Sequence, residues 1–255
     1  MSRQIVIERA SGKRRPFRSF FQSVFSGLLD FIYPPICPLC SRSIDDEGPL
    51  CSLCLENLLK DFQVTCYHNK AHFKYLEETI CFDKVLACWT FTPQIETLIH
   101  IVKYQQGRKL GKVLGRIAGE RIQEQFPNLS GNVIVPVPLH FVRRRERGYN
   151  QSEILSRGIA EIIPIPIRTN VLIRKKHTQT QTLLSAKERQ ENVQEAFLVR
   201  DGKSIMNRHV VLIDDIVTTG ATMQQCAKAM IQAGAASVTG LALARPVIDL
   251  QRDAE

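Results

Sequence analysis

Residues 210–222 read VVLIDDIVTTGAT, and a helical run from Met223 to Ala233 that stops at Gly234 follows them. The first four of these residues are aliphatic, as expected of a parallel strand that is covered on both faces. Gly220 allows the tight turn that must come before the helix begins. The stretch therefore predicts a buried strand, a turn and a helix, and hence an α/β domain.

Two carboxylates close the predicted strand, at the end where ligands bind in open α/β sheets. The hydroxyl-rich turn beyond them presents backbone N–H groups at the start of a helix, which is a favourable place for a phosphate. The carboxylates lie too close to that phosphate to be its partners, so they suit hydroxyl donors such as those of a ribose. We therefore expect both ends of a ribose 5-phosphate to be held by Asp214, Asp215, Thr218, Thr219, Gly220, Ala221 and Thr222.

Two other interpretations of this acidic strand end stay open. The first is an apolar strand that ends in an Asp-rich turn, although caps and turns require only one or two of these residue types. The second is the metal-holding strand of a nucleotide hydrolase, which also needs a phosphate loop. The nearest candidate loop, residues 107–113, has three residues between its glycines rather than four, and Val113 stands where a hydroxyl is required.

Short apolar runs alternate with helical segments along the C-terminal two thirds of the chain. Apolar residues from 93 to 126 recur at helical spacing with a break near Gly107, which predicts two helices. Strands that alternate with helices favour a doubly wound, mostly parallel sheet. The strands we predict are residues 85–91, 133–137, 167–173, 209–213 and 237–244.

Basic residues follow two of the predicted strands, and the formal net charge of the chain is +9. Guanidinium groups next to a sheet end can bind a pyrophosphate or a nucleic-acid backbone, because their planar donors match phosphate oxygens. A charge run of this kind is also typical of a solvated loop. The residues that we expect to face anionic groups are Arg143, Arg144, Arg145 and Arg147 in one loop and Lys175 and Lys176 in another.

Four of the eight cysteines form two Cys-x-x-Cys pairs within 18 residues. Such pairs arrange four thiolates around one ion, and an all-sulfur shell is typical of structural zinc, with a redox role as the alternative. We expect zinc to fold this short segment through Cys37, Cys40, Cys51 and Cys54. A second, degenerate site stays open at Cys66, Cys81, His68 or His72, although neither cysteine belongs to such a pair.

The sequence divides into three parts: a basic amphipathic lead at 1–33, a zinc-ribbon-like module at 34–84 and an α/β domain at 85–250. We interpret the lead as a helix that docks on the rest of the protein, with a membrane-surface or partner-binding helix as the alternative. No run of 18 apolar residues occurs, and polar residues interrupt the N-terminal apolar stretch. We therefore expect neither a membrane span nor a secretion signal, and a cytoplasmic location.

The stretch 210–222 resembles the thirteen-residue signature of phosphoribosyltransferases along its whole length. Other parts of the chain are similar to the ComF family, a competence-protein branch of that fold whose double-zinc-ribbon version carries Cys-x-x-Cys pairs in front. The resemblance covers roughly residues 30–246 and departs from the family pattern at the second set of four cysteines. The similar parts are Lys103-Tyr104, 135–138, 147–151, Thr178 with Gln181, and Arg189 with Asn192.

The resemblance implies a phosphoribosyltransferase-like sheet behind a zinc ribbon. It also implies that the acidic pair holds the ribose 2- and 3-hydroxyls of phosphoribosyl pyrophosphate, that the turn holds its 5-phosphate, and that magnesium accompanies its diphosphate. Family membership further implies a link to DNA uptake or to the processing of single-stranded DNA, with a protein of the competence machinery as partner.

Two functions fit these observations. In the first, the domain is a phosphoribosyltransferase-type enzyme in which a nucleophile attacks the anomeric carbon as pyrophosphate leaves, although the sequence identifies neither a nucleophile nor a general base. In the second, it is a non-catalytic nucleic-acid-binding adaptor whose ribose-phosphate pocket senses a ligand and whose affinity for DNA falls with salt. The basic loops serve either function, so the sequence leaves both open.

Overall fold

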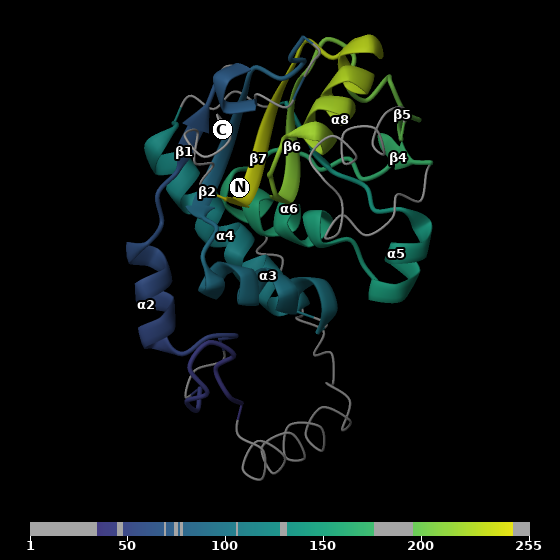
Figure 1. Ribbon diagram of the computed structural model, residues 1–255. Helices are drawn as coiled ribbons and strands as arrows, with labels where there is room; N and C mark the ends of the chain where they lie inside the picture. The colour runs from purple at the N-terminus through teal and green to yellow at the C-terminus, as the bar shows by residue number, and fades with distance from the viewer. Residues whose placement is uncertain are drawn as a thin grey trace, which may run out of the picture.

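The computed structural model describes residues 35–44, 48–68, 70–73, 76, 79–105, 107–127, 132–175 and 196–246. Within these ranges, one sheet is formed by β1 (Thr65–Tyr67), β2 (Lys84–Thr90), β3 (Val133–Pro136), β6 (His209–Ile216) and β7 (Ser237–Arg245). The strand order is β1-β2-β7-β6-β3 (Figure 1). β1 is antiparallel to β2, and the other neighbours are parallel, so the mostly parallel sheet is confirmed.

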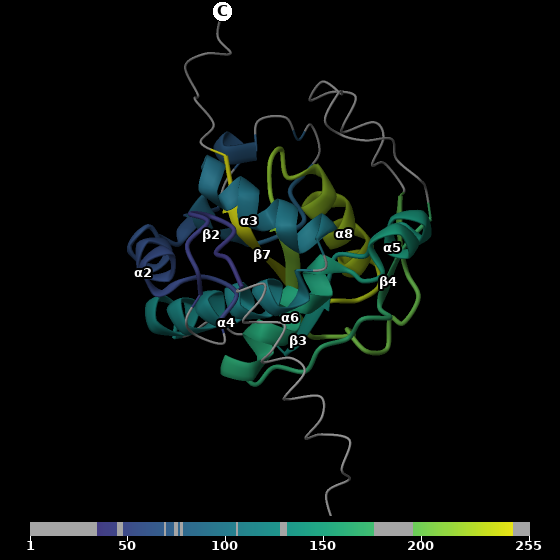
Figure 2. The ribbon, with the colours of Figure 1, turned by 90° about the horizontal axis from the view of Figure 1, so that it is seen from below.

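Helices cover both faces of this sheet. The helices α3 (Pro93–Tyr104), α4 (Arg108–Gln125) and α6 (Gln151–Ile162) share one apolar cluster with Ile213 of β6. The helix α8 (Ala221–Gln232) shares a second cluster with Leu212, the preceding residue of the same strand. Figures 1 and 2 accordingly show α8 on the face opposite α4 and α6. The doubly wound fold and the helix break near Gly107 are therefore confirmed.

The backbones of α4 and α6 touch at glycines. A Cβ atom on Gly115 would lie 2.4 Å from the carbonyl oxygen of Leu155, and one on Gly158 would lie 2.2 Å from that of Lys112. Glycine is therefore required for the two helices to pack at this distance. The close packing holds α6 against the sheet, with its first turn beside the carboxyl-terminal end of β6.

Gly158→Ala is expected to lower the free energy of unfolding by about 2 kcal/mol, because the added methyl group must push two helix backbones apart. Urea unfolding followed by circular dichroism measures the change. Gly202→Ala is the matched control, since a Cβ atom there would meet no atom closer than 3.6 Å. Equal stability of the two variants would show that the helices do not touch as described.

The cysteine segment docks on β2 through the single tryptophan of the chain. The ring of Trp89 meets that of Phe62 edge-on at 4.5 Å between centroids, and its Nε1 donates to the carbonyl oxygen of Leu58 at 3.0 Å. Leu58 belongs to α2 (Ser52–Lys60), which lies beside the sheet at the lower left of Figure 1. The segment and the sheet therefore share one apolar core.

The strand predicted at residues 167–173 is wrong in its extent. Only β4 (Leu172–Arg174) is a strand there, and it pairs antiparallel with β5 (Phe197–Val199) outside the central sheet. A turn at Thr169 and Asn170 interrupts the run, because asparagine favours turns over strands. Before that turn, Ile167 makes a single bridge to Ile134 of β3.

The basic residues predicted to form a loop at 143–147 lie on a helix, α5 (Phe141–Arg147), which ends at Gly148 with a φ of +73°. Basic residues in the last turn of a helix interact favourably with its dipole, a local signal that our loop interpretation did not use. No helix within the described ranges is both long enough and apolar enough to cross a membrane.

The three-part division of the chain stays a prediction. Residues 1–33, the basic amphipathic lead, lie outside the described residues. The interpretation of the lead as a docking helix therefore stays a prediction. β1 and the short 3-10 turn η1 (Lys70–Phe73) come before residue 85, yet β1 is part of the central sheet. Part of the segment assigned to the zinc-ribbon-like module thus contributes to the α/β domain.

Candidate functional site

The acidic pair lies at the carboxyl-terminal end of β6, and the hydroxyl-rich turn joins β6 to α8. In that turn Thr218 is exposed, whereas Thr219 and Thr222 are half-buried. Gly220, with a φ of +83°, is the N-cap of α8, and Ala221 is the first residue of the helix. The first N–H groups of a helix have no partner within it, so this helix start can receive an anion.

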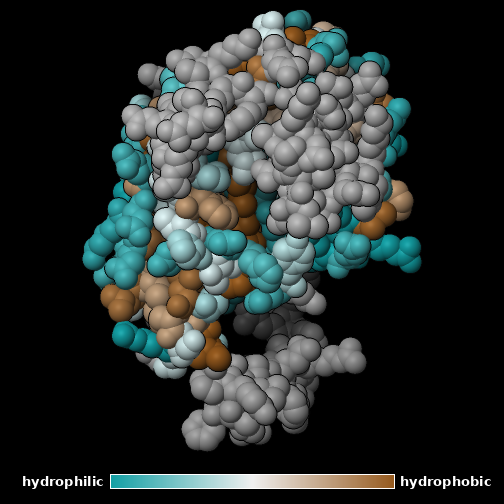
Figure 3. All heavy atoms as spheres, in the orientation of Figure 1, coloured by the Kyte–Doolittle hydropathy of each residue, from teal (hydrophilic) through white to brown (hydrophobic). Residues whose placement is uncertain are grey.

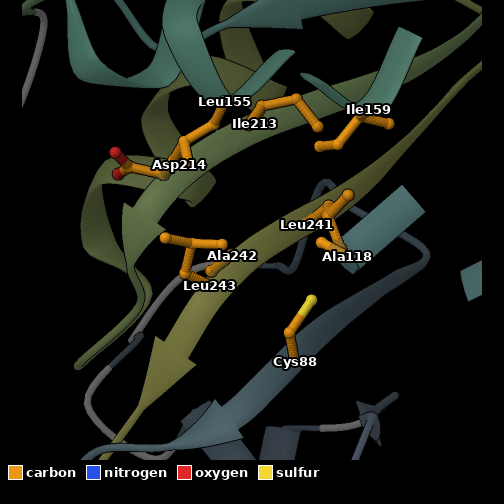
Figure 4. A pocket seen from close by; sticks show the side chains of 9 residues that line it. All are labelled: Cys88, Ala118, Leu155, Ile159, Ile213, Asp214, Leu241, Ala242 and Leu243. Carbon is orange, nitrogen blue, oxygen red and sulfur yellow. The ribbon is translucent and has the colours of Figure 1, made fainter. Parts of the chain in front are cut away.

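Both carboxylates are enclosed by polar partners. As whole residues, Asp214 and Asp215 are 9% and 6% exposed. Oδ1 of Asp214 accepts hydrogen bonds from the hydroxyl of Ser152 at 3.2 Å and from the backbone N–H of Asp215 at 2.9 Å. Oδ2 of Asp215 lies 2.6 Å from Nζ of Lys103. Figure 4 shows the carboxylate of Asp214 directed away from Leu241 and the other apolar side chains between the sheet and the helices.

Burial raises the pKa of Asp214 to about 7, and repulsion by Asp215 acts in the same direction. Lys103 lowers that pKa. The Asp214 carboxyl group therefore keeps its proton to a higher pH than a free aspartic acid does. A ligand hydroxyl that donates a hydrogen bond to the carboxylate favours the ionised form.

The contacts of Lys103 and Ser152 with the acidic pair were missed by the sequence analysis. Ser152 stands in the first turn of α6, whose N-cap, Asn150, accepts from the Ser152 N–H and donates to the carbonyl oxygen of Val137 at 2.9 Å. Lys103 stands in the last turn of α3. No spacing pattern links these residues to Asp214 and Asp215, because the contacts depend on how the helices pack on the sheet.

Arg147, which we predicted to face an anion, is engaged within the protein. Its Nη1 donates to Oε1 of Gln151 at 3.0 Å and its Nη2 to the hydroxyl of Tyr104 at 3.1 Å. The guanidinium also lies 4.8 Å from the centroid of the Tyr104 ring. These contacts join α5 and α6 to the end of α3, so Arg147 has a structural role in this arrangement.

The other predicted basic residues differ in exposure. Arg144 and Arg145 are exposed on α5, and Arg143 is half-buried. Beside them Phe141 is 70% exposed, and Figure 3 shows apolar and hydrophilic side chains next to each other over α5 at its right-hand edge. Phe141 is not among the residues predicted from the sequence. Of the second basic loop, Lys175 is exposed and Lys176 lies outside the described residues.

The two Cys-x-x-Cys pairs come together. The Sγ atoms of Cys37, Cys40, Cys51 and Cys54 all lie within 4.8 Å of one another, and those of Cys40 and Cys51 are 3.6 Å apart. A tetrahedral zinc ion with bonds of about 2.3 Å separates its sulfur ligands by about 3.8 Å, so the group fits zinc. Burial raises the pKa of the Cys37 thiol, but backbone hydrogen bonds outweigh it and bring the pKa to about 6, whereas burial and the neighbouring thiols raise the pKa of Cys54. One thiol of the group therefore ionises more readily than another.

The degenerate second site is not assembled in the described part of the chain, where the four clustered cysteines form the one group that could hold a metal ion. Sγ of Cys66 lies 3.0 Å from Nε2 of His68. Cys81 is tied to α8 instead, because its N–H donates to Oε1 of Gln224 at 3.0 Å. The two cysteines therefore serve different contacts.

Two domain families match the chain. The family described as Phosphoribosyl transferase domain matches residues 103–249, and the one described as Double zinc ribbon domain matches residues 28–83. The first match contains the acidic pair and the turn, and the second contains the four clustered cysteines. The cysteine cluster and the zinc-ribbon match together support structural zinc.

Three curated relatives are similar over most of their length. Competence protein F of Haemophilus influenzae is 31% identical over 215 residues, which cover 78% of this chain and 91% of the relative. Competence protein ComFC of Bacillus subtilis is 35% identical over 212 residues, which cover 82% of this chain and 78% of the relative. DNA utilization protein YhgH of Escherichia coli is 28% identical over 217 residues, with 82% and 90% covered. The chain therefore belongs to the ComF family of competence and DNA-utilization proteins, in which a phosphoribosyltransferase domain follows a zinc ribbon.

Proposed function

We propose that the protein binds phosphoribosyl pyrophosphate, together with magnesium, at the carboxyl-terminal end of β6. The observation that carries this proposal is the direct succession of a buried carboxylate pair and a helix start rich in hydroxyls. Asp214 and Asp215 come at the end of the strand, and the turn to Gly220 follows at once. A pentose that bears a phosphate offers hydroxyl donors to the first and an anion to the second.

Each part of the site has a role in this proposal. The hydroxyls of Thr218, Thr219 and Thr222 and the first N–H groups of α8 bind the 5-phosphate. The carboxylates of Asp214 and Asp215 accept from the ribose 2- and 3-hydroxyls. Carboxylate oxygens are also ligands that Mg²⁺ takes, so the same pair would face an ion shared with the substrate. When bound, that ion would neutralise charge on the diphosphate.

Transfer of the phosphoribosyl group is the reaction that this arrangement suits. An acceptor forms a bond to the anomeric carbon while the bond from that carbon to the pyrophosphate oxygen breaks. No general base is assigned among the residues of the proposed site. Positioning of the sugar and stabilisation of the departing charge would therefore supply the rate. By its relatives' names, we connect this activity with the use of incoming DNA.

A nucleic-acid adaptor is the second candidate, and α5 favours it. Exposed Arg144 and Arg145 can bind phosphates, and the exposed ring of Phe141 can stack on a base. Single-stranded DNA is bound in this way, through cationic side chains beside aromatic surfaces, and its affinity falls with salt. The two candidate functions use different residues, so they can be tested independently.

Titration calorimetry with phosphoribosyl pyrophosphate and magnesium tests the first function. Asp214→Asn/Asp215→Asn is expected to weaken binding about 100-fold, because two charged hydrogen-bond acceptors are lost. Asp61→Asn, which changes an exposed carboxylate after α2, is the control and should bind as the wild type does. Unchanged affinity of the double variant would remove the basis of the proposal. Pyrophosphate release with an acceptor present would establish catalysis.

The same variants, titrated with a short single-stranded DNA, test the adaptor. DNA binding is expected to survive Asp214→Asn/Asp215→Asn and to weaken in Arg144→Ala/Arg145→Ala and in Phe141→Ala. Because the arginines contact phosphates, their removal should also reduce the salt dependence of binding. Wild-type protein that binds no DNA at low salt would exclude this second function.

A further inference from the structure

Arg245, the last residue of β7, is buried, with 2% of its surface exposed. Its guanidinium lies 4.0 Å from the centroid of the Tyr67 ring and 4.3 Å from that of Phe73. Nη2 donates to the carbonyl oxygen of His72. Within the described part of the chain, Nε and Nη1 are buried without a hydrogen-bond partner. Buried charges in proteins are normally paired, so this arginine calls for an explanation.

Two contacts position Arg245 beside the hydroxyl-rich turn, residues 217–222, which we call the phosphate turn. The N–H of Val217, where the turn begins, donates to the carbonyl oxygen of Ala244 at 3.0 Å. The ring of Phe73, which the guanidinium contacts, also covers Gly220, since a Cβ atom there would lie 2.5 Å from the ring. The guanidinium of Arg245 and Gly220 at the start of α8 therefore lie against the same aromatic ring.

The chemistry of Arg245 selects an oxyanion as its missing partner. Two aromatic rings and the carbonyl oxygen of His72 attract its cationic group, but neither carries a full negative charge that would balance it. Burial lowers the pKa of Arg245, which reflects the same lack of compensation. The neighbouring turn lacks a positive charge, because residues 217–222 contain no basic residue that would balance a phosphate dianion.

We propose that Arg245 binds an oxyanion of the ligand that is held at the phosphate turn. On binding, this oxyanion replaces the His72 carbonyl oxygen as the partner of the guanidinium. This inference deepens the proposed function and rests on it, since the 5-phosphate of the sugar is that oxyanion. The turn supplies neutral donors, and Arg245 supplies the compensating charge. The arginine is kept buried and incompletely bonded so that the phosphate, when it binds, becomes its partner.

Ribose 5-phosphate and inorganic pyrophosphate are the probes for Arg245→Met, which removes the charge but keeps a long apolar side chain. Ribose 5-phosphate is expected to bind about 10- to 100-fold more weakly, and pyrophosphate is expected to bind as it does to the wild type. Without ligand, the variant is expected to have the same Tm as the wild type or a higher one, because it no longer buries an uncompensated charge. Arg200→Met, an exposed change of equal charge, is the control.

Two results would overturn the assignment of Arg245 alone. One is wild-type affinity of Arg245→Met for ribose 5-phosphate, or a loss confined to pyrophosphate. The other is a Tm well below that of the wild type with an unchanged Tm increase on adding ribose 5-phosphate, which is the signature of a structural role. If the proposed function itself were wrong, the wild type would bind neither ribose 5-phosphate nor phosphoribosyl pyrophosphate. That result would overturn both the proposed function and the role of Arg245, and it differs from the two results above.

Discussion

Cys54→Ser is expected to abolish zinc binding and to unfold residues 35–62 while the central sheet stays folded. Binding of structural zinc contributes about 10–16 kcal/mol in isolated zinc-binding peptides, and a segment of this size has few other sources of stability. The four cysteines are placed so that they could hold one ion, and Leu58 and Phe62 of the same segment pack in one apolar cluster with residues of the sheet. Zinc loss should therefore also detach the segment from β2.

Trp89 makes this outcome measurable. It is the single tryptophan, and its ring packs against Phe62 while its Nε1 donates to the carbonyl oxygen of Leu58. Detachment is expected to shift its fluorescence to longer wavelength, and hydrogen exchange should show lost protection at residues 35–62 alone. Metal analysis should find one zinc ion per chain in the wild type and in the control Cys66→Ser. A Cys54→Ser protein with full zinc content and unshifted fluorescence would contradict the assignment.

Lys103→Met is expected to lower the free energy of unfolding by about 3 kcal/mol, because it leaves a buried carboxylate without its cation. Nζ of Lys103 lies 2.6 Å from Oδ2 of Asp215, and the two side chains are 21% and 9% exposed. Lys103 also lowers the pKa of Asp214, so its removal raises that pKa further. A raised carboxyl pKa in the folded state means that stability falls as pH rises, so the loss should be smaller near pH 5 than near pH 8.

Urea unfolding of a double-mutant cycle measures this effect. Lys103→Met/Asp215→Asn is expected to recover most of the lost stability, since the asparagine needs no cation. Lys112→Met is the control, because the ion pair of Lys112 with Glu161 is exposed and is worth at most about 1 kcal/mol. A loss in Lys103→Met no larger than in Lys112→Met would show that the buried pair is not formed.

Local signals account for the features that the sequence predicted correctly. The aliphatic run before Asp214 and the glycine at 220 act within a few residues, and they specify the strand, the turn and the start of α8. The spacing of the Cys-x-x-Cys pairs likewise specifies four ligands for one ion. The strand predicted at 167–173 failed for a local reason too, since Asn170 favours a turn.

The sequence by itself determined the doubly wound sheet, the zinc ligands and the stretch that carries the proposed ribose-phosphate site, because each depends on neighbours along the chain. Only the tertiary structure decided that Lys103 and Ser152 enclose the carboxylates and that Arg245 lies beside the turn. These contacts join residues that are far apart in the sequence. They depend on the touching backbones of α4 and α6 and on the packing of η1 against Gly220, and no local pattern encodes those distances.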